Sequence, residues 1–376
     1  MIYEKAGSTE TTGPAEASPG LDEPSGRVRI RRKRRRSWLK RHKSLSILLL
    51  VAVVLLAIIA GWLWWLNHQL DDVRRFDTEL GEHRPAQGEG TDILLMGVDD
   101  LDGSRDVGDS VYDMLDSGSW EPGVARSDTL MVLHIESDHR AAQLISIPRD
   151  SWVDIPGHGK SKINAAFSWG GPSLTARTVE KNLDLRIDHM MIVDFDGFKD
   201  VTEAIGGVNV FVPATVTDPR SGTTDWERGF HHIEGDDALH YVRTRYSLPG
   251  GDFDRINRQQ NFLRTVLDKL TSRGVLLNPL RVTRLADTLG RLVMVDEGLT
   301  NEKLRGLALD SRHLRSGSMR FLTAPNSGSG MIGEASVVHL DIGRTKKMFD
   351  AMELGQFESW YAKHEVGELP PTTQVN

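Results

Sequence analysis

Apolar residues fall into one long run near the N-terminus and a series of short runs further along the chain. The long run, Leu45 to Leu66, has 22 residues and no charge. Beyond residue 90 the apolar runs have the length of β-strands, and a helix-length segment, 197–205, lies between two of them. The strand-length runs are 92–100, 130–135, 142–147, 189–195 and 208–212. Strands interleaved with helices predict an α/β fold, an α-β-α sandwich around one mixed central sheet.

The long apolar run predicts a transmembrane helix over residues 44–66. Its 22 residues include one serine and one glycine and are long enough to cross a bilayer. Trp62, Trp64 and Trp65 stand at one end, where indoles favour the membrane interface. The run is longer than the apolar part of a signal peptide, and tryptophans occupy the place of a cleavage site. Residues 27–43 carry eleven Lys or Arg, which places the N-terminus in the cytoplasm. We therefore expect a single-pass protein of the cell membrane that contacts membrane lipid.

The chain then divides into five predicted segments. Residues 1–43 form a basic cytoplasmic tail, disordered because its first part is rich in Gly, Pro, Ser, Thr and Glu. The transmembrane helix, 44–66, is followed by a stalk and linker over 67–90, in part helical. A folded extracytoplasmic domain is expected over 91–352, and a C-terminal tail over 353–376.

Charge and cysteine content exclude several classes of function. The first 66 residues carry 12 Lys and Arg against 5 Asp and Glu, in a chain whose net charge is −7. The predicted extracytoplasmic part is therefore acidic, which argues against nucleic acid as a partner, because phosphate neutralisation needs a basic face. The chain has no cysteine, which excludes disulfides, thiolate catalysis and zinc–sulfur sites.

Charged residues stand where three predicted strands begin or end. Asp99 ends one strand, Arg126 and Asp128 precede the next, and Arg149 and Asp150 follow a third. A single aspartate at such a place usually caps a helix or defines a turn. The recurrence favours a second interpretation, in which these side chains converge on a crevice at one edge of the sheet.

A second group of charges lies in the segment His240 to Gln260, which holds four arginines and two aspartates. A helix over 238–245 is predicted to end before Pro249, and a second helix to run to about residue 272 with Asp252 or Asp254 as its N-cap. Four residues separate Arg255 from Gln259, so both lie on one face of that helix.

Two interpretations of this arginine segment are open. Guanidinium groups bind phosphate oxygens in pairs and keep their charge, so the segment suits a pyrophosphate at a helix N-terminus. Ordinary ion pairs on a solvated face are the alternative, Arg255 with Asp252, and Arg258 with Asp254 or Glu234.

Six motifs in one order, GVDD, RSDT, SIPRD, KIN, YVRTR and DFDRINRQQ, follow the apolar run. This set resembles the LytR-CpsA-Psr family of cell-wall glycopolymer ligases. The resemblance is strong from Asp92 to about Leu270 and looser to about Met352. It implies a membrane-anchored phosphotransferase whose catalytic domain lies outside the membrane. Such an enzyme moves a glycopolymer-phosphate from a polyprenyl-pyrophosphate carrier onto peptidoglycan, at a muramic acid 6-hydroxyl.

The resemblance also implies roles for individual residues. Asp99 and Asp128 match the carboxylates that bind Mg²⁺, for which Mn²⁺ can substitute. The residues that match the pyrophosphate-binding positions are Arg126, Arg149, Arg243, Arg245, Arg255 and Gln259. Of the matched positions, those expected to act in catalysis are Arg126, Arg149, Asp252 and Arg255, and Lys162 lies in the KIN motif. Phosphoryl transfer needs charge neutralisation and in-line positioning more than a covalent nucleophile.

Three parts of the site stay open at this stage. Either Asp252 or Asp254 could accept the proton of the attacking hydroxyl. A polyprenyl chain needs an apolar groove, and the aromatic residues Phe167, Trp169, Phe195 and Phe198 suit either that groove or the protein core. The polar insertion from Asp100 to Ala125 departs from the family pattern and is expected to form a lid or rim.

Two other functions compete with the ligase. A transcriptional regulator could use the basic tail, but the predicted topology leaves only that tail in the cytoplasm. A polyprenyl-pyrophosphate-binding pyrophosphatase would use the same site with water as the acceptor. The polymer is equally open, with teichoic acid, capsular polysaccharide, an arabinogalactan-like galactan and a protein-linked glycan all compatible with the residues.

Overall fold

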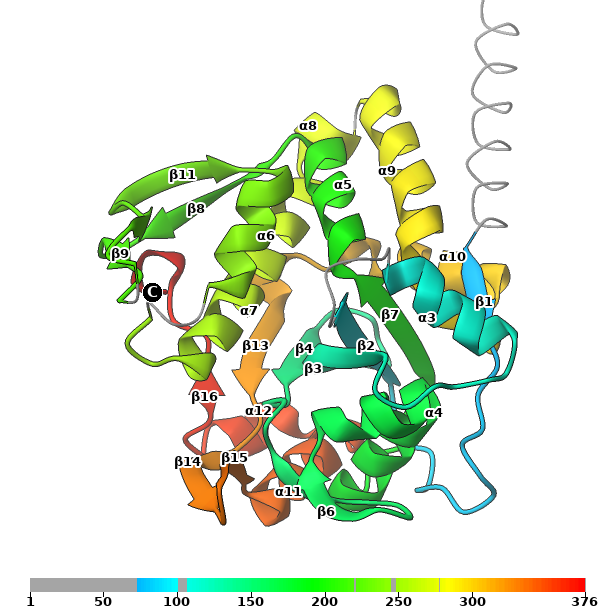
Figure 1. Ribbon diagram of the computed structural model, residues 1–376. Coiled ribbons are helices and arrows are strands. Elements are labelled where there is room, and N and C mark those ends of the chain that lie inside the picture. Colours follow the sequence, from blue (N-terminus) through cyan, green and yellow to red (C-terminus); the bar gives the residue numbers. More distant parts are fainter. Residues whose placement is uncertain (1–72, 101–106, 220, 245–247, 277, 376) are drawn as a thin grey trace, which may run out of the picture. The chain divides into compact units, whose positions relative to one another are not determined.

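The fold is built on one central sheet that mixes parallel and antiparallel strands (Figure 1). The computed structural model describes residues 73–375 except 101–106, 220, 245–247 and 277. The sheet has eight strands in the order β1-β12-β7-β2-β3-β4-β13-β16. In that order their bounds are Arg74–Phe76, Val293–Asp296, His189–Asp194, Thr91–Asp100, Ala125–Ile135, Ala142–Ser146, Met319–Thr323 and Gly367–Glu368. Strand β2 pairs parallel with β7 and antiparallel with β3, so the predicted mixed sheet is confirmed.

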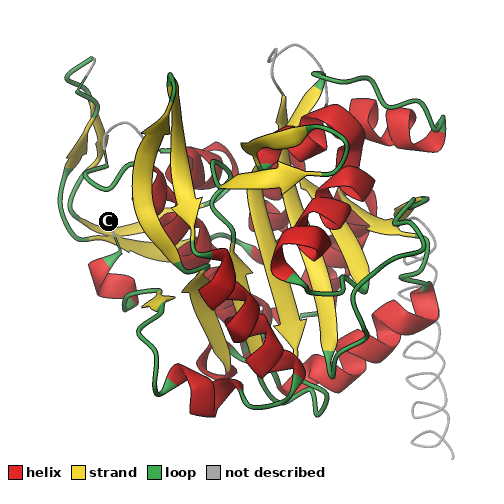
Figure 2. Ribbon diagram, turned by 90° about the horizontal axis from the view of Figure 1, so that it is seen from below, coloured by secondary structure: helices red, strands yellow, loops and turns green. Residues whose placement is uncertain are grey.

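Helices cover both faces of this sheet (Figures 1 and 2). Helices α4 (Asn164–Leu183) and α11 (Ile342–Glu353) cover one face, where Phe167 and Phe349 pack with Leu94 of β2. The other face meets α7 (Asp252–Leu270), whose Leu263 packs with Met131. The neighbouring helices on that side are α5 (Phe195–Ile205), α6 (Gly235–Arg243) and α9 (Pro279–Leu292). Because both faces are covered, the central strands are apolar at nearly every position, which explains the short uninterrupted apolar runs.

Several smaller elements surround the sandwich. Four two-stranded pairs join β5 (Trp152–Ile155) to β6 (Gly159–Lys162), β8 (Val208–Val212) to β11 (Gly229–Ile233), β9 (Val216–Thr217) to β10 (Thr224–Trp226), and β14 (Asn326–Ile332) to β15 (Ala335–Leu340). The remaining α-helices are α3 (Val107–Asp116), α8 (Arg273–Leu276), α10 (Asn301–Asp310) and α12 (Phe357–Tyr361). The predicted strand 208–212 therefore exists, but it lies in a hairpin outside the central sheet.

The ends of the folded body differ from the expected segment boundaries. Arg74–Phe76, expected in the linker, forms edge strand β1 beside β12. Gly367–Glu368, expected in the tail, pairs with β13 and forms the opposite edge, and Val375 is buried. Strand β1 pairs with backbone groups of β12, and β16 with those of β13, which water would otherwise have to solvate. Sequence alone missed them because strands of two or three residues are too short to show alternation.

The expected transmembrane helix, 44–66, lies outside the described residues. Within residues 73–375, as far as they are described, no helix is long and apolar enough to cross a membrane.

The insertion between β2 and β3 is attached to the body where it is described. Helix α3 buries Val111 in the main core and lies near β1 and β2. Further along, the indole N–H of Trp120 donates to the backbone carbonyl of Ser168 at 3.2 Å, and the ring packs edge-on against Phe167. The insertion therefore reaches helix α4 beside the cavity described below.

Candidate active site

A β-bulge sets the position of Asp128. Along the β2–β3 pair, Gly97 lies opposite Thr129 and Val98 opposite Ser127, so Asp128 is the extra residue. A bulge of this kind redirects the side chain and is common next to active sites. Two residues away, Asp99 lies opposite Arg126, so the backbone places Asp99 at the same end of the sheet. The side chain of Asp99 lies outside the description.

A backbone hydrogen bond and two carboxylates fix the position of Arg149. It follows strand β4, and its backbone carbonyl accepts from the N–H of Asn164 at 3.1 Å. Its guanidinium forms an ion pair with Asp128, and its Nε lies 3.8 Å from Oδ1 of Asp252. Burial alone would lower the pKa of Arg149, but the carboxylates of Asp128 and Asp252 outweigh it and raise that pKa.

The first turns of α7 bring the second group of charges to the same place. Arg255 Nη2 lies 2.8 Å from Asp252 Oδ1, and both Arg255 and Gln259 are less than one-tenth exposed. The predicted N-cap is wrong: Gly251 stands at the cap position, and Asp254 accepts instead from the N–H of Gly250 at 2.8 Å.

Arg258 has a different setting from the other arginines of this segment. It is fully buried, its guanidinium lies 4.7 Å from the centre of the Tyr241 ring, and burial lowers its pKa. The alternative placed Arg258 on a solvated face, and this placement is wrong, because the side chain of Arg258 is fully buried. The pairing of Arg255 with Asp252 is confirmed.

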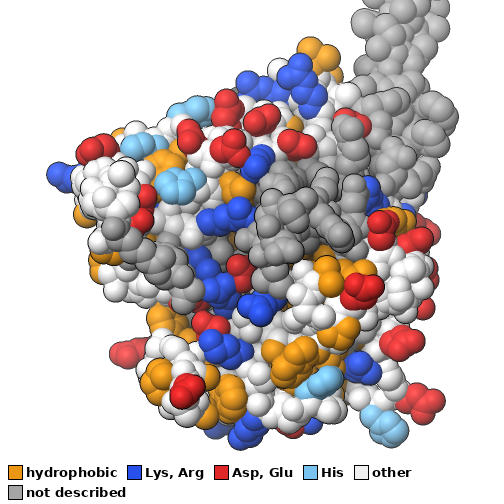
Figure 3. All heavy atoms as spheres, in the orientation of Figure 1, with side chains coloured by type: hydrophobic (Ala, Val, Ile, Leu, Met, Phe, Trp, Pro, Cys, Tyr) orange, Lys and Arg blue, Asp and Glu red, His pale blue; other side chains and the backbone are white. Residues whose placement is uncertain are grey.

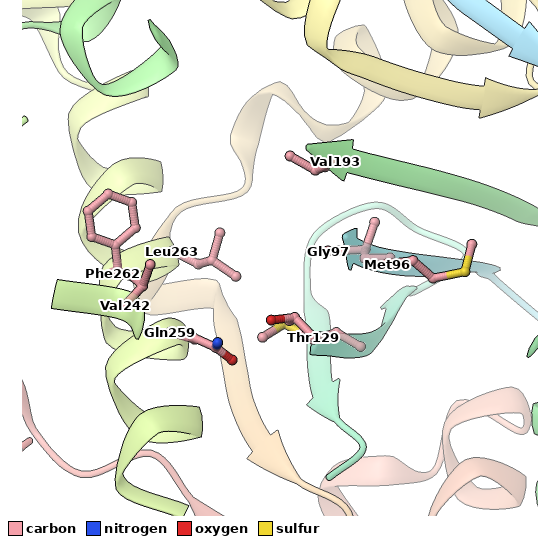
Figure 4. A pocket seen from close by; sticks show the side chains of 10 residues that line it. Met96, Gly97, Thr129, Val193, Val242, Gln259, Phe262 and Leu263 are labelled. Atoms are coloured by element: carbon pink, nitrogen blue, oxygen red, sulfur yellow. The ribbon is translucent and has the colours of Figure 1, made fainter. Parts of the chain in front are cut away.

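Three adjoining cavities run past these charges. The first is apolar, with a volume of about 110 Å³, between α6 and α7 on one side and the ends of β2, β3 and β7 on the other (Figure 4). Figure 4 shows Gln259 and Leu263 of α7 facing Thr129 and Gly97 across it. The second is narrow, about 10 Å³, and lies between Asp128, Arg149, Asp252 and Arg255, with Gln259 and Thr129 shared with the first.

The third cavity is polar and larger, about 420 Å³, and shares Asp128 and Arg149 with the narrow one. Its further lining residues are Arg126, Asp150, Ser161, Lys162, Asn164, Ala165, Ser168 and Trp169. Lys162 Nζ lies 3.1 Å from Asp150 Oδ1, and the ring of Trp169 stacks on His158 with 4.9 Å between ring centres. In Figure 3, Lys and Arg side chains gather near the centre of the face that α6, α7 and β3 occupy in Figure 1.

The structure brings most of the predicted site residues together. Asp128, Arg149, Asp252, Arg255 and Gln259 line the narrow cavity, and Arg126 lines the polar one. The exposed side chain of Arg243 stands at the end of α6, next to Val242 of the apolar cavity. Arg245 lies outside the described residues.

Of the four aromatic residues that suit either a groove or the core, the structure describes the side chains of Phe167 and Trp169, and Trp169 lines the polar cavity. Phe167 is fully buried in the main core, and the side chains of Phe195 and Phe198 lie outside the description. The apolar cavity is instead lined by aliphatic side chains, Phe262 and two methionines. The sequence holds a partial indication of this apolar lining. Phe262 and Leu263 follow Gln259 by three and four residues, so all three lie on one face of a helix.

The residues present suit a magnesium ion in their chemistry. Asp128 and Asp99 offer carboxylate oxygens, the ligands that Mg²⁺ prefers together with phosphate oxygens and water. No group of three or more His, Asp or Glu able to hold a metal ion occurs among the described side chains. A site of two protein carboxylates therefore needs its remaining ligands from the substrate and from water.

Cationic and acidic side chains thus meet after strand β4, at the bulge of β3 and at the start of α7, beside an apolar cavity. The sequence model of the LytR_cpsA_psr family matches residues 67–353, and the chain belongs to this family. It is similar to two cell wall biosynthesis proteins of Corynebacterium glutamicum. One is named as the probable cell wall biosynthesis protein LcpB, and it is 39% identical over 60% of this chain and 53% of LcpB. The other is the cell wall biosynthesis protein LcpA, which is 31% identical over 83% of this chain and 66% of LcpA.

A further relative is the polyisoprenyl-teichoic acid–peptidoglycan teichoic acid transferase TagV of Bacillus subtilis, 34% identical over 55% of this chain and 53% of TagV. The chain thus spans about half to two thirds of the length of these relatives. Among solved structures, B. subtilis TagV superposes with a TM-score of 0.56 at 26% identity, over 73% of this chain and 99% of that chain. The structure of TagT bound to LIIa-WTA superposes with a TM-score of 0.54 at 26% identity, over 75% of this chain and 97% of the TagT chain.

Proposed function

We propose that this chain is a membrane-anchored phosphotransferase. It moves a glycopolymer-phosphate from a polyprenyl-pyrophosphate carrier onto peptidoglycan. The observation that supports this most directly is the order of the three cavities, with shared residues at each junction: the first is apolar, the second lies between two arginines and two aspartates, and the third is polar. A polyprenyl-pyrophosphoryl donor has a hydrocarbon chain followed by two phosphates, which match the first two cavities, and the polar cavity stands beside the phosphates.

The arginines act as ligands for the pyrophosphate. Arg149 and Arg255 meet at the narrow cavity, and Arg126 lines the adjoining polar one. Arg243 and Arg245 are assigned the same role from the family resemblance alone. Asp252 lies near both Arg149 and Arg255 and orients their planar groups toward the same space. Gln259 stands where the phosphates would meet the apolar chain, and its amide can donate to a phosphate oxygen.

Charge neutralisation carries most of the catalysis in this proposal. Phosphoryl transfer spreads negative charge over the transferred group, and fixed guanidinium groups stabilise that charge without reorganising. Asp99 and Asp128 would hold a magnesium ion, which would supply further positive charge to the phosphate oxygens.

The relatives support a cell-wall polymer as the cargo. TagV and TagT of B. subtilis are named polyisoprenyl-teichoic acid–peptidoglycan teichoic acid transferases, and LcpA is a cell wall biosynthesis protein. Teichoic acid and arabinogalactan are therefore the first polymers to offer as donors.

Product analysis tests the transfer itself. The purified full-length chain is incubated with a polyprenyl-pyrophosphoryl glycan, peptidoglycan and Mg²⁺, and the product is identified by mass spectrometry. We expect a phosphodiester between the glycan and peptidoglycan. Release of free glycan-phosphate alone would identify a pyrophosphatase instead, and an unchanged donor would reject both activities.

The apolar cavity gives an independent test with a matched control. Leu263→Trp narrows the cavity and should raise KM about tenfold for a long-chain donor, with little effect on a donor whose chain is only a few carbons long. Leu280→Trp, at an exposed position of α9, should leave both KM values unchanged. Equal effects of Leu263→Trp on long and short donors would reject a role for this cavity in binding the chain.

A further inference from the structure

We propose that the polar cavity is the subsite for the acceptor sugar, with Trp169 as its stacking platform and Asp150 as the group that receives the hydroxyl proton. This inference rests on the proposed transfer reaction and assigns its second substrate to a place.

The geometry of phosphoryl transfer places the acceptor on the far side from the polyprenyl chain. The attacking and leaving oxygens lie roughly in line through the transferred phosphorus. The leaving group is polyprenyl phosphate, whose chain requires the apolar cavity beside Gln259 and Leu263. The attacking hydroxyl must therefore approach from the opposite side of the narrow cavity, where Asp128 and Arg149 border the polar cavity.

The lining of the polar cavity suits a sugar. The half-buried Trp169 has His158 stacked on it at an angle of 27°. The electron-rich face of an indole attracts the C–H groups on the flat face of a pyranose. Around it, Asp150 offers acceptors, Lys162 donors, and the Asn164 amide both, which is the mixture that sugar hydroxyl and amide groups require. The volume, about 420 Å³, is sufficient for a sugar unit.

Backbone hydrogen bonds fix this lining. The N–H of Ile163 donates to Ser151 at 2.8 Å, and the N–H of Val338 donates to the carbonyl of Asp150 at 2.9 Å. The loop after β4, the start of α4 and strand β15 are thus joined at Asp150. Preorganised residues of this kind bind a ligand without an ordering cost.

The position of Asp150 distinguishes it from the other candidate bases. Asp252 lines the narrow cavity beside Arg255, and Asp254 accepts from the backbone of Gly250. Asp150 lines the polar cavity, on the side from which the hydroxyl approaches. In the step, the acceptor oxygen bonds to the glycan-linked phosphorus, and the bond from this phosphorus to the bridging oxygen breaks. Polyprenyl phosphate leaves with the electron pair, and the hydroxyl proton passes to the carboxylate of Asp150.

Titration of the full-length chain with a tetrasaccharide of alternating N-acetylglucosamine and N-acetylmuramic acid tests the subsite without a donor. We expect saturable binding, measured by tryptophan fluorescence and by calorimetry. Trp169→Ala should weaken it by about tenfold or more, and Trp169→Phe should restore part of it. The matched control is Trp360→Ala, which removes a tryptophan that also stacks on a histidine, His364, outside the three cavities. Absence of binding, or equal loss in both alanine variants, would overturn the proposal.

Kinetics with both substrates separate this inference from the proposed function. Trp169→Ala should raise KM for the tetrasaccharide about tenfold and leave KM for the donor unchanged. Asp150→Asn should lower kcat for transfer by about 10² or more while tetrasaccharide binding persists. A rise in donor KM alone in Trp169→Ala would assign the cavity to the donor glycan and overturn the inference. Tetrasaccharide binding by a chain that never consumes the donor would reject the proposed function but leave the subsite intact.

Discussion

Arg149 Nε lies 3.8 Å from Asp252 Oδ1, which joins the end of strand β4 to the first turn of helix α7. The same carboxylate lies 2.8 Å from Arg255. Two guanidinium groups from distant parts of the chain therefore share one acidic partner at the narrow cavity.

We predict that Arg255→Lys reduces transfer at saturating donor by about 10², because an ammonium group cannot reproduce the paired N–H donors of a guanidinium. The melting temperature should change little, since the ammonium keeps a positive charge beside Asp252. Arg264→Lys is the control on the same helix, where Arg264 contacts the carbonyl of Pro370 at 3.1 Å, outside the cavities. Normal turnover by Arg255→Lys would make the Arg255–Asp252 pair purely structural.

A divalent metal should be required for turnover. We expect Asp128→Ala and Asp99→Ala each to abolish the dependence of turnover on Mg²⁺ or Mn²⁺ while the circular dichroism spectrum is retained. Rates measured against metal concentration, with a chelator as the zero point, check this. Asp138→Ala, at a turn where Asp138 accepts from the backbone of Arg140, is the control. Full activity in excess chelator would remove the metal from the proposal.

Stability should fall as the pH rises through the range in which Glu353 ionises. Burial, and then the nearby Asp92, Asp350 and Asp184, raise the pKa of Glu353 to about 7, against the opposing effect of His134. The folded protein thus binds this proton more tightly than the unfolded chain, whose group titrates near 4.5. The free energy of unfolding therefore decreases between about pH 4.5 and 7 and levels off above.

Glu353→Gln should remove this decrease, so the melting temperatures of variant and wild type should diverge between pH 5 and 7.5. Glu358→Gln is a control of opposite sign, because the hydrogen bond from Arg320 lowers the pKa of Glu358. The stabilisation from ionised Glu358 is complete above its ordinary pKa and is lost only as the pH falls through the lowered pKa. The difference in melting temperature between Glu358→Gln and wild type should therefore stay constant from pH 5 to 7.5. Parallel melting curves for Glu353→Gln and wild type would contradict the assignment.

Topology can be measured with reporters at the two ends. A reporter that is active only outside the cell should be active when fused after Asn376 and inactive when fused before Met1. The physical reason is the basic run 27–43, which is retained in the cytoplasm beside the predicted helix 44–66. The reverse pattern would favour the transcriptional regulator.

The sequence predicted the parts of the site that local patterns specify. Strand ends, helix limits and the spacing of Arg255 and Gln259 depend on neighbours in the chain, and the structure has them close to where they were expected. The bulge at Asp128 was not predictable, because it depends on the register between two strands. The apolar cavity and the contact of Asp150 with Lys162 were missed for a related reason, since each needs side chains from elements whose packing no local pattern specifies.

Strand β16 protects the outer edge of the sheet. It pairs with β13 at Leu322 and Thr323, and Leu369, which follows it, packs on Phe321. The segment that matches the family ends at residue 353, before this strand begins. A chain shortened to that limit would leave the backbone groups of β13 unsatisfied and expose Phe321 beside them. Such an edge invites pairing with other molecules, so we expect the shortened chain to aggregate more readily than the full one.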